Sequence, residues 1–251
     1  MTPAADIARP NQDGGRQLAF DFGHRPSLGG EDFIVAPCNE AAVAWIDAWP
    51  NWPAPALTIY GPPGGGKTHL AGVWRARAEA IEIPVAAVNP QDIAAALGAA
   101  SAAVVEDADM RAADDSFARG LFHLYNLLAE RRGHLLLTAR APVAQWPLAL
   151  ADLRSRLQAA PAAAIALPDE GLTAALLVKL FADRQLKVGD EVLAYLLARM
   201  ERSFDAARRL VAALDAAALD GKRNVSVPLA GEVLAKFGPH GRGPGGRGPS
   251  T

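Results

Sequence analysis

Short apolar runs alternate with amphipathic segments through the first two thirds of the chain. In residues 33–167, runs of four or five apolar residues are separated by stretches whose apolar residues recur every three to four positions. This alternation predicts an α/β domain with a parallel sheet covered by helices on both faces. The expected strands are residues 56–60, 84–88, 102–106, 134–138 and 163–167, and the expected helices are residues 39–49, 68–80 and 117–131, with a short one near Gln91.

The pattern changes at residue 170, where the strand-like runs stop. Apolar residues such as Leu176, Leu177, Leu180 and Phe181 then recur at helical spacing, and a final helix is expected at residues 228–237. These features predict a second, all-helical subdomain of three or four helices. We therefore divide the chain into a flexible leader at residues 1–30, an α/β domain at 31–168, a helical subdomain at 169–237 and a Gly/Pro/Arg-rich disordered tail at 238–251.

The composition of the chain excludes or disfavours several classes of function. The chain has 251 residues, 51% of them hydrophobic, and a formal net charge of −2, so no overall positive charge draws it to nucleic acid. The single Cys38 excludes an intramolecular disulfide and a zinc site of four thiolates. No apolar run reaches the length of a membrane span, and the N-terminus has no signal-peptide core. We expect a soluble, intracellular protein that does not bind membranes, and DNA binding would need a local basic patch.

The stretch from Gly61 to Leu70 fits the phosphate-binding loop G-x-x-x-x-G-K-[ST], with a strand before it and a helix after it. Its glycines let backbone N–H groups turn towards a polyphosphate, Lys67 reaches the terminal phosphates and the Thr68 hydroxyl ligates Mg²⁺. A glycine-rich turn without a ligand is the alternative, which the strand-loop-helix context disfavours. We expect ATP or ADP to bind here, with Mg²⁺, at Gly61, Pro62, Pro63, Gly64, Gly65, Gly66, Lys67, Thr68 and His69.

A metal-ordering acid is expected at the end of a strand beside this loop. Glu106 and Asp107 follow the apolar run at residues 102–105. Glu106 would hold Mg²⁺ through the nucleotide, and Asp107 would act as the catalytic carboxylate that orients a hydrolytic water. Thr138, which ends the next buried run, would lie near the terminal phosphate if its strand is adjacent. An acidic turn without a metal is the alternative for the first pair.

Two arginines, Arg154 and Arg156, stand two residues apart among apolar residues. A guanidinium is always charged, so it can neutralise charge that develops on a transferring phosphoryl group, even in a neighbouring subunit. A surface salt bridge is the alternative.

The order of these pieces resembles the DnaA branch of the AAA+ ATPases over residues 17–220. The resemblance rests on the loop that ends in Lys67-Thr68-His69-Leu70, on residues 122–126 with the sequence Phe-His-Leu-Tyr-Asn, on the strand ending at Thr138, and on residues 153–157. It implies an α/β domain followed by a helical lid. It also implies that Arg156 is an arginine finger acting in trans and that Arg208 is a lid sensor that contacts the phosphates, with Arg209 as the substitute if the register slips.

Fewer than 20 residues separate the end of the helical pattern near Leu219 from the final helix, which leaves no room for the DNA-reading domain of DnaA itself. The chain is therefore closer to the Hda-like regulators of that branch. The resemblance to these regulators implies a function for residues 17–22. In this segment, Gln17, Leu18, Phe20 and Phe22 are similar to a sliding-clamp-binding peptide. An extended segment packed on its own domain is the alternative. The implied partners are DnaA and the β subunit of the DNA polymerase III sliding clamp. The resemblance also implies a bacterial cytoplasmic protein, associated with the nucleoid or replisome, that makes no direct sequence-specific contact with DNA.

Two positions depart from the family pattern. Glu106 stands where an aspartate is usual, and Arg140 stands where an acid is usual after the sensor strand. Both favour nucleotide retention over turnover, so we expect weak intrinsic ATPase activity. The leading hypothesis is a negative regulator of replication initiation that stimulates ATP hydrolysis by DnaA. The alternatives are a loader ATPase of the DnaC/IstB kind, which would bind single-stranded DNA, and an autonomous ATPase or phosphotransferase.

Overall fold

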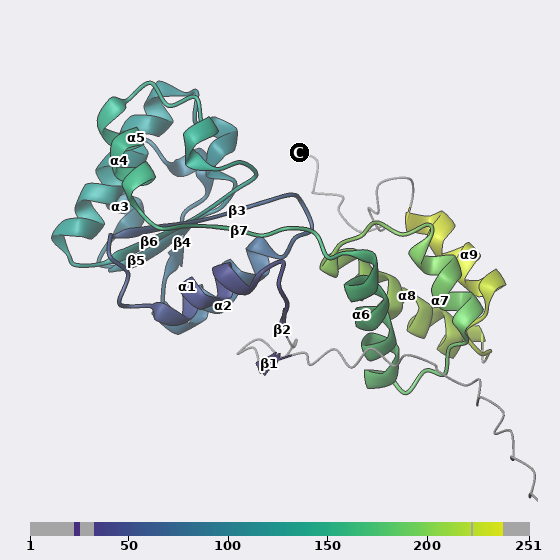
Figure 1. Ribbon diagram of the computed structural model, residues 1–251. Helices are drawn as coiled ribbons and strands as arrows, with labels where there is room; N and C mark the ends of the chain where they lie inside the picture. Colours follow the sequence, from purple (N-terminus) through teal and green to yellow (C-terminus); the bar gives the residue numbers. More distant parts are fainter. Residues whose placement is uncertain (1–22, 26–32, 222, 238–251) are drawn as a thin grey trace, which may run out of the picture.

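A five-stranded parallel sheet forms the centre of the larger part of the molecule (Figure 1). The structure is a computed structural model that describes residues 23–25, 33–221 and 223–237. The strands lie in the order β4-β5-β6-β3-β7, which differs from their order in the sequence. β6 therefore lies between β3, which precedes the predicted phosphate-binding loop, and β5, which precedes the acidic pair. The strands are β3 (Ala56–Tyr60), β4 (Ile81–Glu82), β5 (Ala102–Val105), β6 (His134–Ala139) and β7 (Ala162–Ala164).

Helices cover both faces of the sheet, as the alternating pattern predicts. Successive residues of β6 point to opposite faces: Leu136 packs with one group of helices, and Leu135 and Leu137 pack with the other. The first group is α1 (Glu40–Ala48) and α2 (Lys67–Ala78), and the second is α3 (Ile93–Leu97), α4 (Asp115–Glu130) and α5 (Ala151–Ala159).

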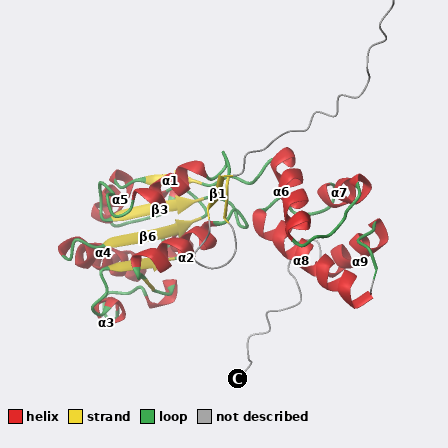
Figure 2. Ribbon diagram, turned by 90° about the horizontal axis from the view of Figure 1, so that it is seen from below, coloured by secondary structure: helices red, strands yellow, loops and turns green. Residues whose placement is uncertain are grey.

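A separate bundle follows the sheet and has its own apolar core. Leu176, Leu196 and Leu214 are fully buried in it, and the carboxyl ends of β3 and β6 point towards it (Figure 2). Ala36, which follows strand β2 (Phe33–Val35), also packs into this core. We call the bundle the lid: α6 (Glu170–Asp183), α7 (Asp190–Leu197), α8 (Phe204–Gly221) and α9 (Val227–Phe237).

The fold class is thus the predicted one, an α/β sheet domain followed by an all-helical lid. The domain boundaries given above remain a prediction. In the described ranges, no helix is both long and apolar enough to cross a membrane.

Several elements differ from the sequence prediction: α5 was not expected, and the last strand is Ala162–Ala164 rather than residues 163–167. The strand expected at residues 84–88 is wrong: Val85–Ala87 is a 3₁₀ turn, and the edge strand β4 precedes it at Ile81–Glu82. The last ladder bond runs from the Ile83 N–H to the Val104 carbonyl, 2.9 Å, and Pro84 has no N–H to continue the pattern. The segment expected to be a leader also contains a strand, β1 (Gly23–Arg25), which pairs antiparallel with β2 (Phe33–Val35).

Phe117 lies in the core between α4 and the sheet and is fully buried. Replacing it with alanine removes a large apolar side chain and leaves a cavity. We expect Phe117→Ala to lower the free energy of unfolding by about 3–5 kcal/mol in a urea titration. The control is Leu219→Ala on α8, whose side chain is 71% exposed and whose loss should change stability by about 0.5 kcal/mol or less. Equal effects of the two variants would contradict the packing described here.

Candidate functional site

The candidate site lies at the carboxyl edge of the sheet, where three strands end side by side. Residue Ile59 of β3 is opposite Thr138 of β6, and Val105 of β5 is opposite Leu137. In a parallel sheet, the segments that follow such strands emerge at the same edge. The loop at residues 61–66 and the acidic pair Glu106-Asp107 therefore meet around the end of β6.

The loop after β3 wraps tightly against the sheet. The Gly61 N–H donates to the Ala139 carbonyl at 3.1 Å, and a Cβ on Gly61 would lie 2.0 Å from the Ile165 carbonyl oxygen. No side chain fits there. Lys67 is the first residue of α2, is only 7% exposed, and its ammonium donates to the Gly61 and Pro62 carbonyls at 2.7 and 2.9 Å. The loop and its lysine thus have the strand-loop-helix arrangement that phosphate binding requires.

The acidic pair contacts both neighbouring elements. The Thr68 hydroxyl donates to Glu106 Oε2 at 2.5 Å, so the two oxygens predicted to share a metal ion lie together. Asp107 has a left-handed backbone, with φ of 49°, and its N–H donates to the buried Thr138 hydroxyl at 3.0 Å. Thr138 therefore fixes the turn that carries Asp107. Among the described residues, no group of three or more His, Cys, Asp or Glu side chains is arranged to hold a metal ion alone.

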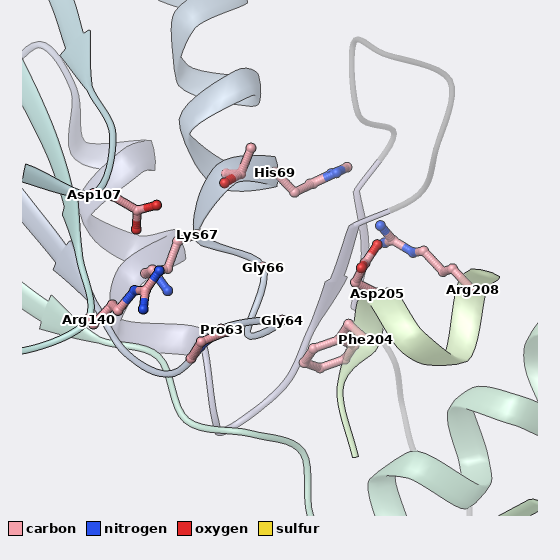
Figure 3. A pocket seen from close by; sticks show the side chains of 11 residues that line it. Pro63, Gly64, Gly66, Lys67, His69, Asp107, Arg140, Phe204, Asp205 and Arg208 are labelled. Carbon is pink, nitrogen blue, oxygen red and sulfur yellow. The ribbon is translucent and has the colours of Figure 1, made fainter. Parts of the chain in front are cut away.

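A cavity of about 520 Å³ separates the loop from the lid. In Figure 3, Asp107, Lys67 and Arg140 lie on the sheet side, and Phe204, Asp205 and Arg208 lie on the lid side. Arg208 thus reaches the cavity, whereas Arg209 forms an ion pair with Asp205 at 3.1 Å. The remaining lining residues are Pro63, Gly64, Gly66, Thr68 and His69.

The loop also touches the lid directly. Gly64 has a φ of +74°, and a Cβ there would lie 2.8 Å from both Cβ and Oγ of Ser203. The Ser203 hydroxyl accepts from the Ala206 N–H at 3.1 Å in the first turn of α8, and α8 carries Arg208. The position of the loop and that of the lid arginine are therefore coupled through one close contact.

Two cations face the sheet side of the cavity. Burial and the nearby Arg140 guanidinium lower the pKa of Lys67, against the opposing effect of Asp107. The loss of hydration is the larger of the two lowering causes. A bound polyanion would compensate for both effects, because its negative charge stabilises the buried ammonium and reduces the repulsion between the two cations.

Arg156 lies away from this cavity. It is on α5, on the far side of the sheet domain from the lid (Figures 1 and 2). Its guanidinium donates to Asn126 Oδ1 at 3.0 Å and stacks over Phe122 and Tyr125, 5.1 and 5.6 Å from the ring centroids. The side chain is exposed at the surface. The neighbouring Arg154 instead donates to the Leu148 carbonyl of its own chain at 3.3 Å.

The remaining residues predicted from the sequence either support the site without lining the cavity or lie outside the described residues. Pro62, Gly65, Glu106 and Thr138 shape the loop and the strand ends without lining the cavity. The predicted clamp peptide, Gln17 to Phe22, lies outside the described residues. Sequence reasoning missed Phe204 and Asp205 on the lid side. The available signal was Ser203, an N-cap residue type directly before the amphipathic pattern of α8.

The lid matches one protein-family model. Residues 169–234 match the model described as "Hda, lid domain", which covers most of α6 to α9. A search of the curated proteins finds no match.

Solved structures match the sheet and lid together. Domain III of the replication initiation protein DnaA from Thermotoga maritima is 19% identical, with a TM-score of 0.65 over 81% of this chain and 93% of that one. AMPPCP-bound DnaA from Aquifex aeolicus is 19% identical, with a TM-score of 0.62 over 75% of this chain and 65% of that one. The branch-migration motor RuvB from Thermotoga maritima is 15% identical, with a TM-score of 0.60 over 82% of this chain and 70% of that one.

The structural matches show that the chain has the fold of DnaA domain III. The family model supports, for the lid, the predicted resemblance to Hda-like DnaA homologues. The chain spans about 65% of the length of the AMPPCP-bound DnaA structures that it matches.

Two glycine variants test the contact between loop and lid. Gly64→Ala forces a Cβ into Ser203 and into a positive φ, so we expect it to lower the free energy of unfolding by about 1 kcal/mol or more. The matched control is Gly72→Ala in α2, where a Cβ meets nothing within 4 Å. That variant should raise stability by about 0.5–1 kcal/mol, because alanine favours a helix interior over glycine. Urea denaturation measures both, and a Gly64→Ala protein as stable as the native chain would contradict the contact.

Proposed function

We propose that this Hda-like DnaA homologue regulates replication initiation by binding nucleotide and the sliding clamp and by stimulating ATP hydrolysis on DnaA. One observation carries the proposal: Arg156 is exposed on α5, outside the cavity of its own chain, in a molecule whose lid matches the Hda lid domain. An arginine in that place is available to a nucleotide held by another subunit. Such a regulator acts in the bacterial cytoplasm.

The nucleotide of this chain occupies the cavity between loop and lid. Lys67 and Arg208 face that cavity from opposite sides (Figure 3), and both are donors suited to phosphate oxygens. A DnaA structure with the same fold is bound to AMPPCP, which supports ATP or ADP as the ligand class. The nucleotide spans the two parts of the molecule and sets the angle between them.

The residues at the end of β5 fit a magnesium ion held jointly with the nucleotide. The Thr68 hydroxyl and Glu106 carboxylate meet at 2.5 Å, and hydroxyl and carboxylate oxygens are the ligands that Mg²⁺ prefers. The ion would neutralise phosphate charge. Asp107, which lines the cavity, is the carboxylate placed to orient water. We propose that this chain's own turnover is weak, since its role lies in presenting Arg156.

The surroundings of Arg156 suit a residue that acts in trans. Phe122, Tyr125 and Asn126 of α4 hold its guanidinium at the surface through two ring faces and one amide oxygen. These contacts orient the long Arg156 side chain before a partner binds, so less conformational entropy is lost on binding. An arginine finger contributes about 10³–10⁵ in rate in GTPase systems, so one residue accounts for an effect of the size a regulator needs.

Residues 17–22 would tether the protein to the clamp. Leu18, Phe20 and Phe22 supply alternating apolar anchors and Gln17 a polar one, and a short peptide with a few deeply buried anchors binds well once ordered. Tethering to the clamp on DNA raises the local concentration of Arg156 near DnaA.

The first test is a steady-state measurement of ATP hydrolysis by DnaA in the presence of DNA-loaded clamp and this protein. Arg156→Ala should lower the stimulation by about 100-fold or more, because the partner's transition-state charge loses its neutralising group. Arg154→Ala is the control, since that side chain bonds its own Leu148 carbonyl and should leave the stimulation within a few fold. Undiminished stimulation by Arg156→Ala would eliminate the proposed role.

The second test is a clamp pull-down that compares the native chain with the double variant Gln17→Ala, Leu18→Ala. We expect the variant to lose clamp binding while its folding and its nucleotide binding stay unchanged, because residues after position 33 form the sheet and the lid. Tight binding of labelled single-stranded DNA without clamp binding would instead favour the loader ATPase.

A further inference from the structure

Three tryptophans and one histidine meet at the amino end of the sheet, the end that points away from the lid (Figure 2). Trp49 directly follows α1, Trp52 lies in the loop before β3, Trp74 lies on α2, and His134 is the first residue of β6. Trp52 stacks on Trp74 with ring centroids 5.3 Å apart, and Trp49 meets Trp74 edge to face at 6.3 Å. We call these four residues the tryptophan cluster. It joins α1, α2 and the central strand.

His134 contacts two indole rings and one carbonyl group of this cluster. Its ring centroid lies 6.0 Å from that of Trp49 and 5.3 Å from that of Trp52, nearly perpendicular to both. Its Nε2 lies 3.0 Å from the Pro50 carbonyl oxygen. A carbonyl oxygen only accepts, so Nε2 carries the hydrogen and donates it. His134 thereby fastens the start of the loop at residues 50–55 to the central strand.

The same loop is attached at two further points. The Trp52 indole N–H donates to the Trp45 carbonyl of α1 at 2.7 Å, and the Leu135 N–H donates to the Pro55 carbonyl at 2.7 Å. Both of these bonds join groups that do not titrate near neutral pH. Of the three attachments, the one through His134 is therefore the one whose strength depends on a proton.

The charged groups around the cluster offer no negative partner to a protonated His134. Arg77 of α2 lies over the Trp49 ring, 5.6 Å from its centroid, and pairs with Asp47 at 4.0 Å. In the turn before β6, Arg131 donates to a backbone carbonyl at 2.8 Å and Arg132 is exposed. Within the described ranges, no carboxylate forms an ion pair with His134. A proton on its ring would add a further positive charge to a surface that already carries three arginines.

We propose that His134 is an acid-sensitive latch: the neutral ring closes the tryptophan cluster over the loop at residues 50–55, and protonation of the ring opens the cluster and releases the loop. A protonated imidazole donates from both nitrogens, whereas Pro50 supplies one acceptor. The buried indole N–H groups of Trp49 and Trp74 themselves have no hydrogen-bond acceptor in the described part of the chain, so the cluster has none to spare. The inference does not depend on the nucleotide or clamp binding proposed above.

The direction of the pH effect follows from the surroundings of the ring. Burial lowers the pKa of His134, and the bond to the Pro50 carbonyl opposes this with a smaller effect. The folded chain therefore takes up this proton less readily than the unfolded chain, in which a histidine has a pKa of about 6.5. The latch contributes its full stability above that pH. The contribution is lost as the pH falls towards the lowered pKa of the folded chain.

The test is urea denaturation of the full chain between about pH 7.5 and about pH 5, a range that spans the ordinary histidine pKa. His134→Gln keeps a side-chain N–H for the Pro50 carbonyl and does not titrate. Relative to this variant, the folding equilibrium constant of the native chain should fall as the pH is lowered, by up to about ten-fold per pH unit, the limit for uptake of one proton. His123→Gln on α4 is the control, because His123 lies outside the cluster, and it should retain the native pH dependence.

Each chain is compared with itself across pH, so a loss of stability at neutral pH in His134→Gln does not affect the comparison. Equal pH dependence of the native chain and His134→Gln would overturn the latch. A native chain that gains stability relative to the variant at low pH would also overturn it, because the indole faces would then be holding the charged ring.

A second measurement needs no variant. In the native chain, an NMR titration of the His134 ring should give a pKa below the unfolded value, and tryptophan emission should shift to longer wavelength in the same one-proton step, before far-UV circular dichroism is lost. A ring that titrates at or above the unfolded value, or one whose protonation leaves the emission unchanged, would contradict the proposal.

Discussion

The pairing of β6 with both β3 and β5 is the constraint on which the site depends. Because all three strands are parallel and in register, the loop after β3, the acids after β5 and the residues after β6 emerge at one edge. Two hydrogen bonds then join these segments: Gly61 N–H to the Ala139 carbonyl, and Asp107 N–H to the Thr138 hydroxyl. The buried Leu135, Leu136 and Leu137 hold β6 between the two helical layers, so the core that stabilises the sheet also positions the chemistry.

This arrangement separates two roles for positive charge. Lys67, Arg140 and Arg208 converge on one cavity from the loop, the sheet edge and the lid, which suits retention of a phosphate chain. Arg156 is supported by the rings and amide of α4 at a different surface. In the proposed function, the first set would bind the chain's own nucleotide, and the second would offer a positive charge to a nucleotide held by another protein. One molecule would then be both a nucleotide-dependent switch and the source of a catalytic group.

Sequence patterns predicted the elements wherever local and tertiary signals agree. The strand at Ala56–Tyr60 was predicted residue for residue, because a buried parallel strand has a nearly continuous apolar run, here interrupted only by Thr58. The segment at residues 84–88 was wrongly predicted as a strand because it is also apolar. Pro84 ends the ladder of hydrogen bonds, and Val85–Ala87 forms a 3₁₀ helix. The sequence motifs named the loop residues and the lid arginine, and most of these line the cavity; their binding roles stay predictions. The contact of Gly64 with Ser203, the cavity wall at Phe204 and the bond of Asp109 to the Arg140 backbone were not, since each joins segments far apart in sequence that carry no shared pattern.

The central claim is that Arg156 acts outside the pocket of its own chain. The most direct measurement is the affinity of this protein's own site for a non-hydrolysable ATP analogue in Arg156→Ala and Arg208→Ala, measured side by side by equilibrium titration. The account predicts native affinity for Arg156→Ala and a loss of about ten-fold or more for Arg208→Ala, which removes a charged phosphate donor. A comparable loss in Arg156→Ala would show that this arginine serves the nucleotide of its own chain and would contradict the account.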